Sequence, residues 1–356
     1  MSSNSLPRFS IIIPCYNAQA YMREALESAF AQQYDGEIQY VIVDDASPDD
    51  TWSVICEVVE QYSSTRDIVA LRHEQNRGVT ATVDTALSHA TGDWIIEADS
   101  DDVQLPDRCV KTAELIARYP QAVLINLGQI CVDAQGVEYA RRLPVSGASE
   151  HLAESAEERA ALYMSRQPNA PVAHGGYGCS MAFKRSLYEK WGPLSMPDES
   201  RFVQDLPWEL RGFMFGPVLW SNAIACKYRS HDSNLMNRTC HVRSFAEWKS
   251  HELRQSSYAG FEKNAFIRTK ADLCRAMEDN ALSDWSQEDL AACVAMQESY
   301  ILCHRLRHEW WGYSIFYRWW ACLKYASQVP PRYKRWFRNR CLPFLLSVWA
   351  RKWKKS

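Results

Sequence analysis

Long hydrophobic runs are missing from the sequence. A helix needs roughly 20 apolar residues to cross a bilayer. The best candidate near the end of the chain, residues 342–350, is about half as long and contains Pro343. The first residues also lack the basic and then apolar pattern of a secretory signal. We therefore expect a protein that does not cross a membrane and that works in the cytoplasm.

Paired cysteine motifs are missing as well. The twelve cysteines are scattered from Cys15 to Cys341, and no two of them have the spacing Cys-x-x-Cys. This distribution does not indicate a disulfide framework. We therefore expect free thiols in a reducing compartment.

Acidic residues are absent from the last part of the chain. After Glu309 there is no Asp or Glu, whereas eleven Lys and Arg and half of the fourteen Trp lie there. The first 309 residues thus carry a net charge near −14 and the tail near +11. Basic residues interspersed with aromatic pairs are typical of segments that lie in a membrane interface. We expect the tail to bind an anionic membrane surface; alternatively, its tryptophans pack on the rest of the protein.

The composition, 47% hydrophobic and 23% charged, is that of a globular protein with core enough for one large domain or two. β-Branched runs alternate with segments of helical periodicity. Strands are predicted at 9–13, 38–43, 68–71 and 93–98, and helices follow Asn17, begin at Ser47-Pro48 and span 79–90. Asn17 and Ser47 are the expected N-caps. This alternation predicts an α/β fold with a mostly parallel sheet covered by helices on both faces.

In such a sheet, ligands bind at the carboxyl ends of the strands. Three predicted strands end in polar residues there, at 14–17, 44–45 and 99–101. The first strand is not followed by Gly-x-Gly-x-x-Gly, and the chain has no Gly-Lys-Ser/Thr loop. Dinucleotide-binding and P-loop functions are therefore disfavoured.

The run 94–102 delivers Asp99, Asp101 and Asp102 to the end of a short apolar strand. Neighbouring carboxylates repel one another unless a cation lies among them, and a hard divalent ion is a common solution. The alternative is a solvated acidic turn that caps the next helix.

Five ordered motifs carry a resemblance to a known family. They are Ile-Ile-Ile-Pro-Cys-Tyr-Asn at 11–17, Val-Ile-Val-Asp-Asp-Ala-Ser-Pro-Asp-Asp-Thr at 41–51, Asn-Arg-Gly at 76–78, Thr-Gly-Asp-Trp-Ile at 91–95 and Ala-Asp-Ser-Asp-Asp-x-x-x-Pro at 98–106. In this order and spacing they resemble the N-terminal domain of family 2 glycosyltransferases, which have the GT-A fold. The resemblance is close over residues 8–120 and looser over 170–235.

The resemblance implies a nucleotide-sugar donor, a divalent metal ion and transfer with inversion at the anomeric carbon. It places Mg²⁺ or Mn²⁺ on Asp101 with Asp99 beside it. The donor-binding positions that it implies are Pro14, Tyr16, Asn17, Asp45, Arg77, Asp99, Ser100 and His231. Asp44 or Asp45 could instead cap the next helix, and Arg77 could be a plain surface residue. Where family members often have Ala-Arg-Asn, this chain has Thr82-Val83-Asp84, so no donor contact is assigned there.

The second half of the chain supplies the candidate base. A glycine-rich segment, 174–180, precedes the run 202–211, which resembles the family's Glu-Asp motif with Gln204 in place of Glu. Inverting transfer needs a carboxylate to accept the proton of the attacking hydroxyl, and Asp205 occupies that position. Its alternative role is a helix N-cap. His231 lies in a segment that resembles the family's Tyr-Arg-x-His motif.

Beyond residue 240 we expect helices at 245–255, 270–278 and 287–308, and therefore a catalytic domain at 1–235 followed by a helical region at 236–356. The chain lacks the Gln-x-x-Arg-Trp motif of processive synthases, which favours addition of one sugar. The leading hypothesis is an inverting transferase that moves a sugar from a UDP-sugar to a glycan or lipid-linked acceptor in cell-surface polysaccharide synthesis. Alternatives are transfer to polyprenyl phosphate and a non-catalytic nucleotide- or nucleic-acid-binding module; the acidic body disfavours nucleic acid.

Overall fold

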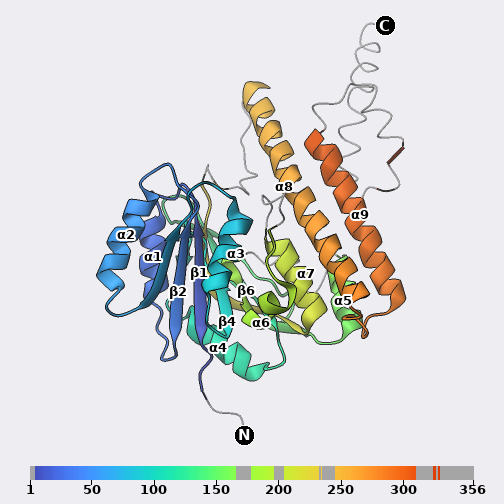
Figure 1. The fold of residues 1–356 in the computed structure, drawn as a ribbon, viewed down its shortest axis with the longest axis horizontal. Helices are drawn as coiled ribbons and strands as arrows, with labels where there is room; N and C mark the ends of the chain where they lie inside the picture. The colour runs from blue at the N-terminus through green and yellow to red at the C-terminus, as the bar shows by residue number, and fades with distance from the viewer. Residues whose placement is uncertain are drawn as a thin grey trace.

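The computed structural model describes residues 5–165, 178–195, 204–231, 234, 245–309, 324–325 and 328. Within these residues one ten-stranded sheet has the order β3-β2-β1-β4-β9-β6-β10-β5, with β7 beside β6 and β8 beside β10 (Figure 1). The strands are β1 Phe9–Cys15, β2 Ile38–Asp44, β3 Asp67–Arg72, β4 Trp94–Glu97, β5 Val103–Gln104, β6 Leu124–Val132, β7 Glu138–Arg142, β8 Glu150–Ala153, β9 Met181–Lys184 and β10 Val218–Arg229.

The sheet has a parallel part and a mixed part. Strands β3, β2, β1 and β4 pair in parallel, and β6 pairs in parallel with β10. Strand β9 runs antiparallel to both β4 and β6, so it joins the two parallel groups. The α/β fold predicted from the sequence is confirmed. Because β4, β1 and β2 run side by side in one direction, the residues that follow them meet at one edge of the sheet.

Helices cover both faces of this sheet, so the protein has two hydrophobic core regions, one on each face. The helices are α1 Met22–Phe30, α2 Thr51–Tyr62, α3 Val79–His89, α4 Arg108–Arg118, α5 Ala156–Ser165, α6 Arg185–Trp191, α7 Asp205–Phe215, α8 Phe245–Glu278 and α9 Gln287–Glu309. Side chains of β1 alternate between the faces: Ile12 packs with α3 and α7, whereas Ile11 and Ile13 pack with α1, α2 and α4. This period of two is the ordinary geometry of a strand buried on both sides.

Two predicted helix starts are wrong. Helix α1 begins at Met22 after Tyr21, while Asn17 has a left-handed backbone (φ 53°) and does not cap it. Helix α2 begins at Thr51 after Asp50, and Ser47 instead donates to the Asp44 carboxylate. Strand β1 also ends one residue later than Pro14, at Cys15. Ser47, which could cap a helix, uses its side chain in the loop that follows β2, and Asn17 uses its backbone N–H in the loop that follows β1. Local sequence patterns do not distinguish these uses from capping.

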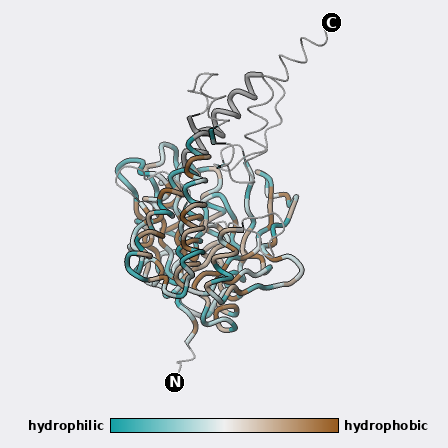
Figure 2. Tube along the Cα trace, turned by 90° about the vertical axis from the view of Figure 1, so that its right-hand side faces the viewer, coloured by the Kyte–Doolittle hydropathy of each residue, from teal (hydrophilic) through white to brown (hydrophobic). Residues whose placement is uncertain are grey.

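The C-terminal helices α8 and α9 pack along each other and onto α7 and α5 (Figure 1). Helix α8 is continuous from Phe245 to Glu278, so the two separate helices predicted at 245–255 and 270–278 are one. Figure 2 shows hydrophobic segments running through the body and hydrophilic loops at its periphery. Among the described residues, no helix combines the length and the hydrophobicity required to cross a bilayer. The basic tail after Glu309 lies outside the described residues, apart from 324–325 and 328.

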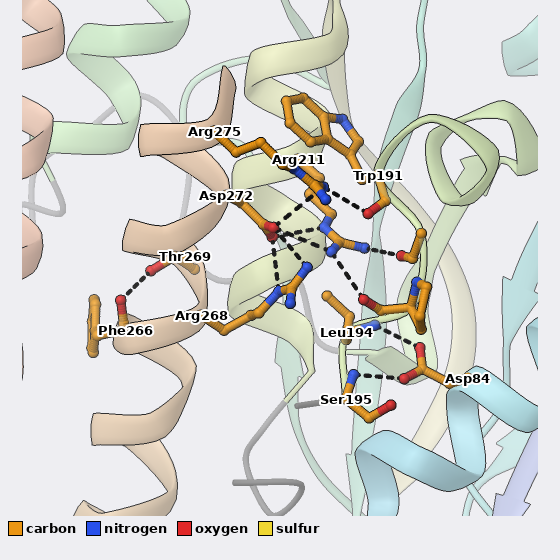
Figure 3. Close-up of polar contacts among 12 residues, drawn as sticks. Asp84, Trp191, Leu194, Ser195, Arg211, Phe266, Arg268, Thr269, Asp272 and Arg275 are labelled. Carbon is orange, nitrogen blue, oxygen red and sulfur yellow. Dashed lines mark hydrogen bonds and ion pairs between the residues drawn. The ribbon is translucent and has the colours of Figure 1, made fainter. Parts of the chain in front are cut away.

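A buried ion pair joins α7 to α8 (Figure 3). Arg211 Nε donates to Asp272 Oδ2 at 2.9 Å, and the two side chains are 0% and 2% exposed. Arg211 Nη1 also donates to the carbonyl of Gly192 at 2.7 Å. Arg268 of α8 reaches the other oxygen of Asp272 at 2.8 Å. The C-terminal helices are therefore attached to the sheet domain by a charge network whose central pair, Arg211 and Asp272, is fully buried.

Asp84 fixes the neighbouring loop (Figure 3). Its carboxylate accepts hydrogen bonds from the backbone N–H groups of Leu194 (2.8 Å) and Ser195 (2.6 Å). At the position where the sequence departs from the family pattern, the chain thus uses a carboxylate to hold its own backbone.

Candidate active site

The first predicted donor residues lie where β1 ends. Pro14 is buried within β1 opposite Val43, whereas Tyr16 is 50% exposed immediately beyond the strand. Asn17 is exposed, and its backbone N–H donates to Ser47 Oγ at 2.9 Å. The left-handed conformation of Asn17 turns the chain away from the sheet and leaves the Tyr16 ring at the surface of the edge. An aromatic ring in this place can stack on a nucleoside base.

Asp45 organises the loop that leads into α3. Its buried carboxylate accepts hydrogen bonds from the backbone N–H groups of Arg77 (2.8 Å) and Gly78 (2.7 Å), and His73 Nδ1 lies 2.7 Å away. Three of the roughly four acceptor positions of a carboxylate are used in this way. The Arg77 side chain itself is exposed. The role of His73 was not predicted, because a single histidine after a strand belongs to no sequence motif that indicates its partner.

Asp44 has a different set of partners. It accepts hydrogen bonds from the backbone N–H and the hydroxyl of Ser47, and Arg72 Nε lies 3.0 Å from its other oxygen. Asp44 therefore does not cap α2 directly, because Ser47, to which it is hydrogen-bonded, lies several residues before the start of this helix.

Three carboxylates gather just after β4. Asp99, Asp101 and Asp102 can each place an oxygen within 4.8 Å of the other two. Asp99 and Asp101 are half-buried with Ser100 between them, and Asp102 is buried with Oδ2 lacking a hydrogen-bond partner among the described residues. Oxygen ligands of this kind, one of them unsatisfied, fit a hard divalent cation such as Mg²⁺ or Mn²⁺.

His231 joins this cluster, as the sequence suggested. Its Nε2 lies 2.8 Å from Asp101 Oδ2, and its ring is 4.6 Å from the ring of Tyr21 between centroids. Asn234 Nδ2 reaches the same Asp101 oxygen at 3.3 Å. The last strand of the sheet therefore brings a histidine and an amide to the principal predicted metal ligand.

Arg229 is a site residue to which the sequence analysis assigned no role. Its backbone N–H donates to Asp102 Oδ1 at 2.8 Å, and its Nε donates to the Asp101 carbonyl at 3.0 Å. The guanidinium also pairs with Glu24 at 2.6 Å and lies over the Tyr21 ring. The sequence feature that could have identified Arg229 as a site residue is its position in the Tyr-Arg-x-His segment. Arg229 ties β10 and α1 to the acidic loop and places positive charge beside it.

Asp205 is the first residue of α7 and lies beside a second buried carboxyl, Glu97. Burial, followed by repulsion from Glu97, raises the pKa of Asp205 to about 8, although a hydrogen bond from the Gly178 backbone opposes the shift. Burial likewise raises the pKa of Glu97 to about 7. Burial and the charges of Asp102 and Glu97 raise the pKa of Asp99 well above its ordinary range. Groups with such shifts, gathered at one edge of a sheet, are typical of functional sites.

Residues 166–177, which include the first part of the glycine-rich segment (174–177), lie outside the described residues, as do 232–233. Gly178 is described. It begins a short 3₁₀ turn, Gly178–Ser180, that leads into β9 beside the two carboxyls.

Comparison with known proteins identifies the family of this chain. The family model described as glycosyl transferase family 2 matches residues 10–192. The chain belongs to glycosyl transferase family 2. This match includes β1 to β4 and the acidic cluster, whereas Asp205 and His231 lie beyond its end.

Individual proteins of known name are similar to parts of the chain. EpsE of Bacillus subtilis (strain 168), named a glycosyltransferase, is 32% identical over 141 residues, 40% of this chain and 50% of EpsE. The undecaprenyl-phosphate 4-deoxy-4-formamido-L-arabinose transferase of Sodalis glossinidius is 30% identical over 115 residues, 32% of this chain and 35% of that protein. The chain thus spans half the length of these relatives or less. The solved S. aureus TarS 1-349 covers 82% of this chain and 91% of its own, at 17% identity and a TM-score of 0.48.

Proposed function

We propose that this family 2 protein is an inverting, metal-dependent hexosyltransferase that moves one sugar from a UDP-sugar to a glycan or lipid-linked acceptor in cell-surface polysaccharide synthesis. The observation that carries the proposal is the convergence of Asp99, Asp101, His231 and Asp205, from three distant parts of the chain, at one edge of the sheet. Family membership makes a sugar nucleotide the expected donor.

The donor would lie across the ends of β1, β2 and β4. The exposed ring of Tyr16, beside Pro14 and Asn17, is placed to stack on the uracil, and Asp45 has one acceptor position left for the base. Ser100 and Asp99 would lie beside the ribose. The exposed Arg77 is free of the sheet and can reach a phosphate.

The diphosphate would lie against Asp101, with Asp99 beside it. A divalent ion bound there neutralises the charge of the leaving nucleoside diphosphate. His231 is held against Asp101 and can donate a hydrogen bond to the leaving phosphate in its protonated form. Arg229 adds positive charge behind the acidic loop.

Asp205 would act as the general base. A base is most effective when its pKa lies near the working pH, and that of Asp205 is raised to about 8. In an inverting reaction it removes the proton from the acceptor hydroxyl while the oxygen attacks the anomeric carbon from the face opposite the leaving group. The helix start that holds Asp205 is buried on one side, which limits its motion.

A second candidate function is transfer of the sugar to a polyprenyl phosphate. It is favoured by the similarity to the undecaprenyl-phosphate transferase of Sodalis glossinidius over 115 residues. The two functions share the donor site and differ only in the acceptor.

A screen of nucleotide sugars for hydrolysis tests the proposal. We expect one UDP-sugar to be hydrolysed in the presence of Mn²⁺ and to be spared when EDTA replaces the metal. Addition of undecaprenyl phosphate to the active mixture distinguishes the two functions, because only the second attaches the sugar directly to this lipid phosphate. A protein that hydrolyses no nucleotide sugar under any of these conditions contradicts the proposal.

A further inference from the structure

Glu97 is a fully buried carboxyl that the donor and metal assignments do not use. It ends β4 with 0% of its surface exposed, and its Oε1 accepts a hydrogen bond from Gln204 Nε2 at 2.6 Å. Its Oε2 has no hydrogen-bond partner among the described residues. A carboxyl satisfied at only one oxygen reduces stability relative to an apolar side chain of the same size. Its presence in the sheet core therefore calls for a functional reason.

The position of Gly178 shows how near Glu97 lies to the proposed base. A Cβ added to Gly178 would stand 3.0 Å from Asp205 Oδ1 and 3.0 Å from Glu97 Oε1. The two carboxyl oxygens are therefore at most about 6 Å apart. A glycine at this place leaves room for both groups, and its backbone bonds to Asp205.

Gln204 connects the two carboxyls through the chain. It is the residue before α7, with a buried side chain, and Asp205 follows it directly. Among the described residues, no side chain caps α7 at its N-terminus. The hydrogen bond from Gln204 to Glu97 is thus the side-chain tie that attaches the start of this helix to β4. The motif that is Glu-Asp in the family is Gln204-Asp205 here. The carboxylate beside Asp205 is therefore that of Glu97, on β4, and not one on the preceding residue.

We infer that Glu97 is a positioning residue for Asp205, acting through Gln204 to hold the first turn of α7 against the sheet edge. The inference rests on the proposed function, in which Asp205 is the base. The tie keeps the Asp205 carboxylate on the acceptor side of the sugar. A small displacement of a reacting group costs a large part of the rate, so a rigid tie is worth a loss of stability.

Substitutions at Glu97 and Gln204 test this role. Glu97→Leu removes the hydrogen bond but keeps a side chain of similar size. We expect its kcat to fall by on the order of 10²-fold. Its donor KM and its calorimetric affinity for UDP and Mn²⁺ should be no weaker than those of the wild type, because removal of the Glu97 charge favours the ionised form of Asp99. Its Tm should equal or exceed that of the wild type, because a half-satisfied buried carboxyl has been removed. The double variant E97Q/Q204E rebuilds the bond with its partners exchanged and should recover most of the lost kcat.

Asn126→Leu is the matched control. Asn126 is a buried polar residue of β6 whose two amide atoms have no partner among the described residues. Its replacement should raise Tm without changing kcat.

The inference is overturned if Glu97→Leu keeps the wild-type kcat, if its Tm and UDP affinity fall together with kcat, or if the exchanged pair is no more active than Glu97→Leu. A wild-type protein that hydrolyses no nucleotide sugar contradicts the proposed function instead. In that case the Tm of Glu97→Leu decides whether Glu97 has a structural role. A lower Tm shows that Glu97 serves only to stabilise the fold, and a higher Tm supports a functional role, because the wild-type residue then reduces stability.

Discussion

Asp101 is the residue on which the metal assignment depends most. Asp101→Ala removes the carboxylate that His231 and Asn234 both contact. We expect the variant to lose Mn²⁺-dependent binding of UDP, because the diphosphate would face the remaining acidic groups without a bridging cation. Titration calorimetry with UDP and Mn²⁺ measures this directly. Unchanged affinity would show that the metal lies elsewhere.

Asp205 can be tested without changing its shape. Asp205→Asn keeps the size of the side chain and removes its basicity, so turnover should fall by about 10² to 10⁴-fold, the range expected for loss of a general base. Affinity for UDP should stay nearly the same, because the proposed role of Asp205 concerns the acceptor and not the donor. Initial rates and calorimetry on one preparation separate the two effects. A variant with near-normal turnover would assign the base to another residue.

Residue types after strands were the most informative part of the sequence. Asp99, Asp101 and His231 were predicted as one site, and the structure brings them together because parallel strands end at one edge. Glu97 was missed because it reads as part of an apolar strand. Arg229 and His73 were missed because their partners lie far away in sequence, at Asp102 and Asp45, and no local pattern encodes such pairs. The assigned roles of the donor residues stay predictions.

The ion pair between α7 and α8 decides whether the C-terminal helices stay attached. Asp272→Asn keeps the shape but leaves Arg211 as a buried charge without its counterion, which costs about 3–5 kcal/mol when one partner of such a pair is removed. Denaturant unfolding should show this loss. The matched control is Glu298→Gln, which breaks an exposed pair with Lys270 between α8 and α9 and should cost about 1 kcal/mol or less. Equal effects of the two variants would contradict the buried junction.

Element types could be predicted better than element boundaries. The strands up to β4 and the helices between them follow from alternating periodicity, because each is buried on a face that the pattern encodes. The starts of α1 and α2 could not be predicted, since Asn17 and Ser47 are suitable caps in both helical and loop settings. The continuity of α8 depends on packing against α7 and α9, which a local pattern does not record.

The stability of the whole protein should depend on pH because of three carboxyl groups with raised pKa values at the candidate active site. Burial raises the pKa of Glu97 from 4.5 to about 7, of Asp102 from 3.8 to about 8 and of Asp205 from 3.8 to about 8. The folded state thus holds protons that the unfolded state releases, so the free energy of unfolding falls as pH rises from about 4 to about 8. Mn²⁺ needs ionised ligands and should raise Tm more at pH 8 than at pH 5. Melting curves with Mn²⁺ and with EDTA measure both trends, and a Tm that rises steadily toward pH 8 in EDTA would contradict them.

The charge division of the chain predicts where the protein is found. The tail after Glu309 carries eleven basic residues and no acidic ones, and each basic residue near an anionic leaflet contributes about 1 kcal/mol, screened by salt. Deletion of residues 330–356 should therefore release the protein from anionic liposomes in sedimentation at low salt, while donor hydrolysis continues. Full-length protein that stays in the supernatant would show that the tail is structural, and a lipid-linked acceptor would lose its main support.

The pairing of β5 has a consequence for how this protein is made. Among the described residues, Val103 and Gln104 pair only with β10, at Lys227 and Cys226, and Asp102 takes its backbone hydrogen bond from Arg229. A ribosome that has just released the acidic loop must synthesise more than about a hundred further residues before these partners exist. During that interval the nascent chain displays a cluster of carboxylates with neither its arginine nor its histidine. The candidate active site is therefore completed late in synthesis, and a chain that stops before β10 has an acidic loop without the contacts from Arg229 and His231.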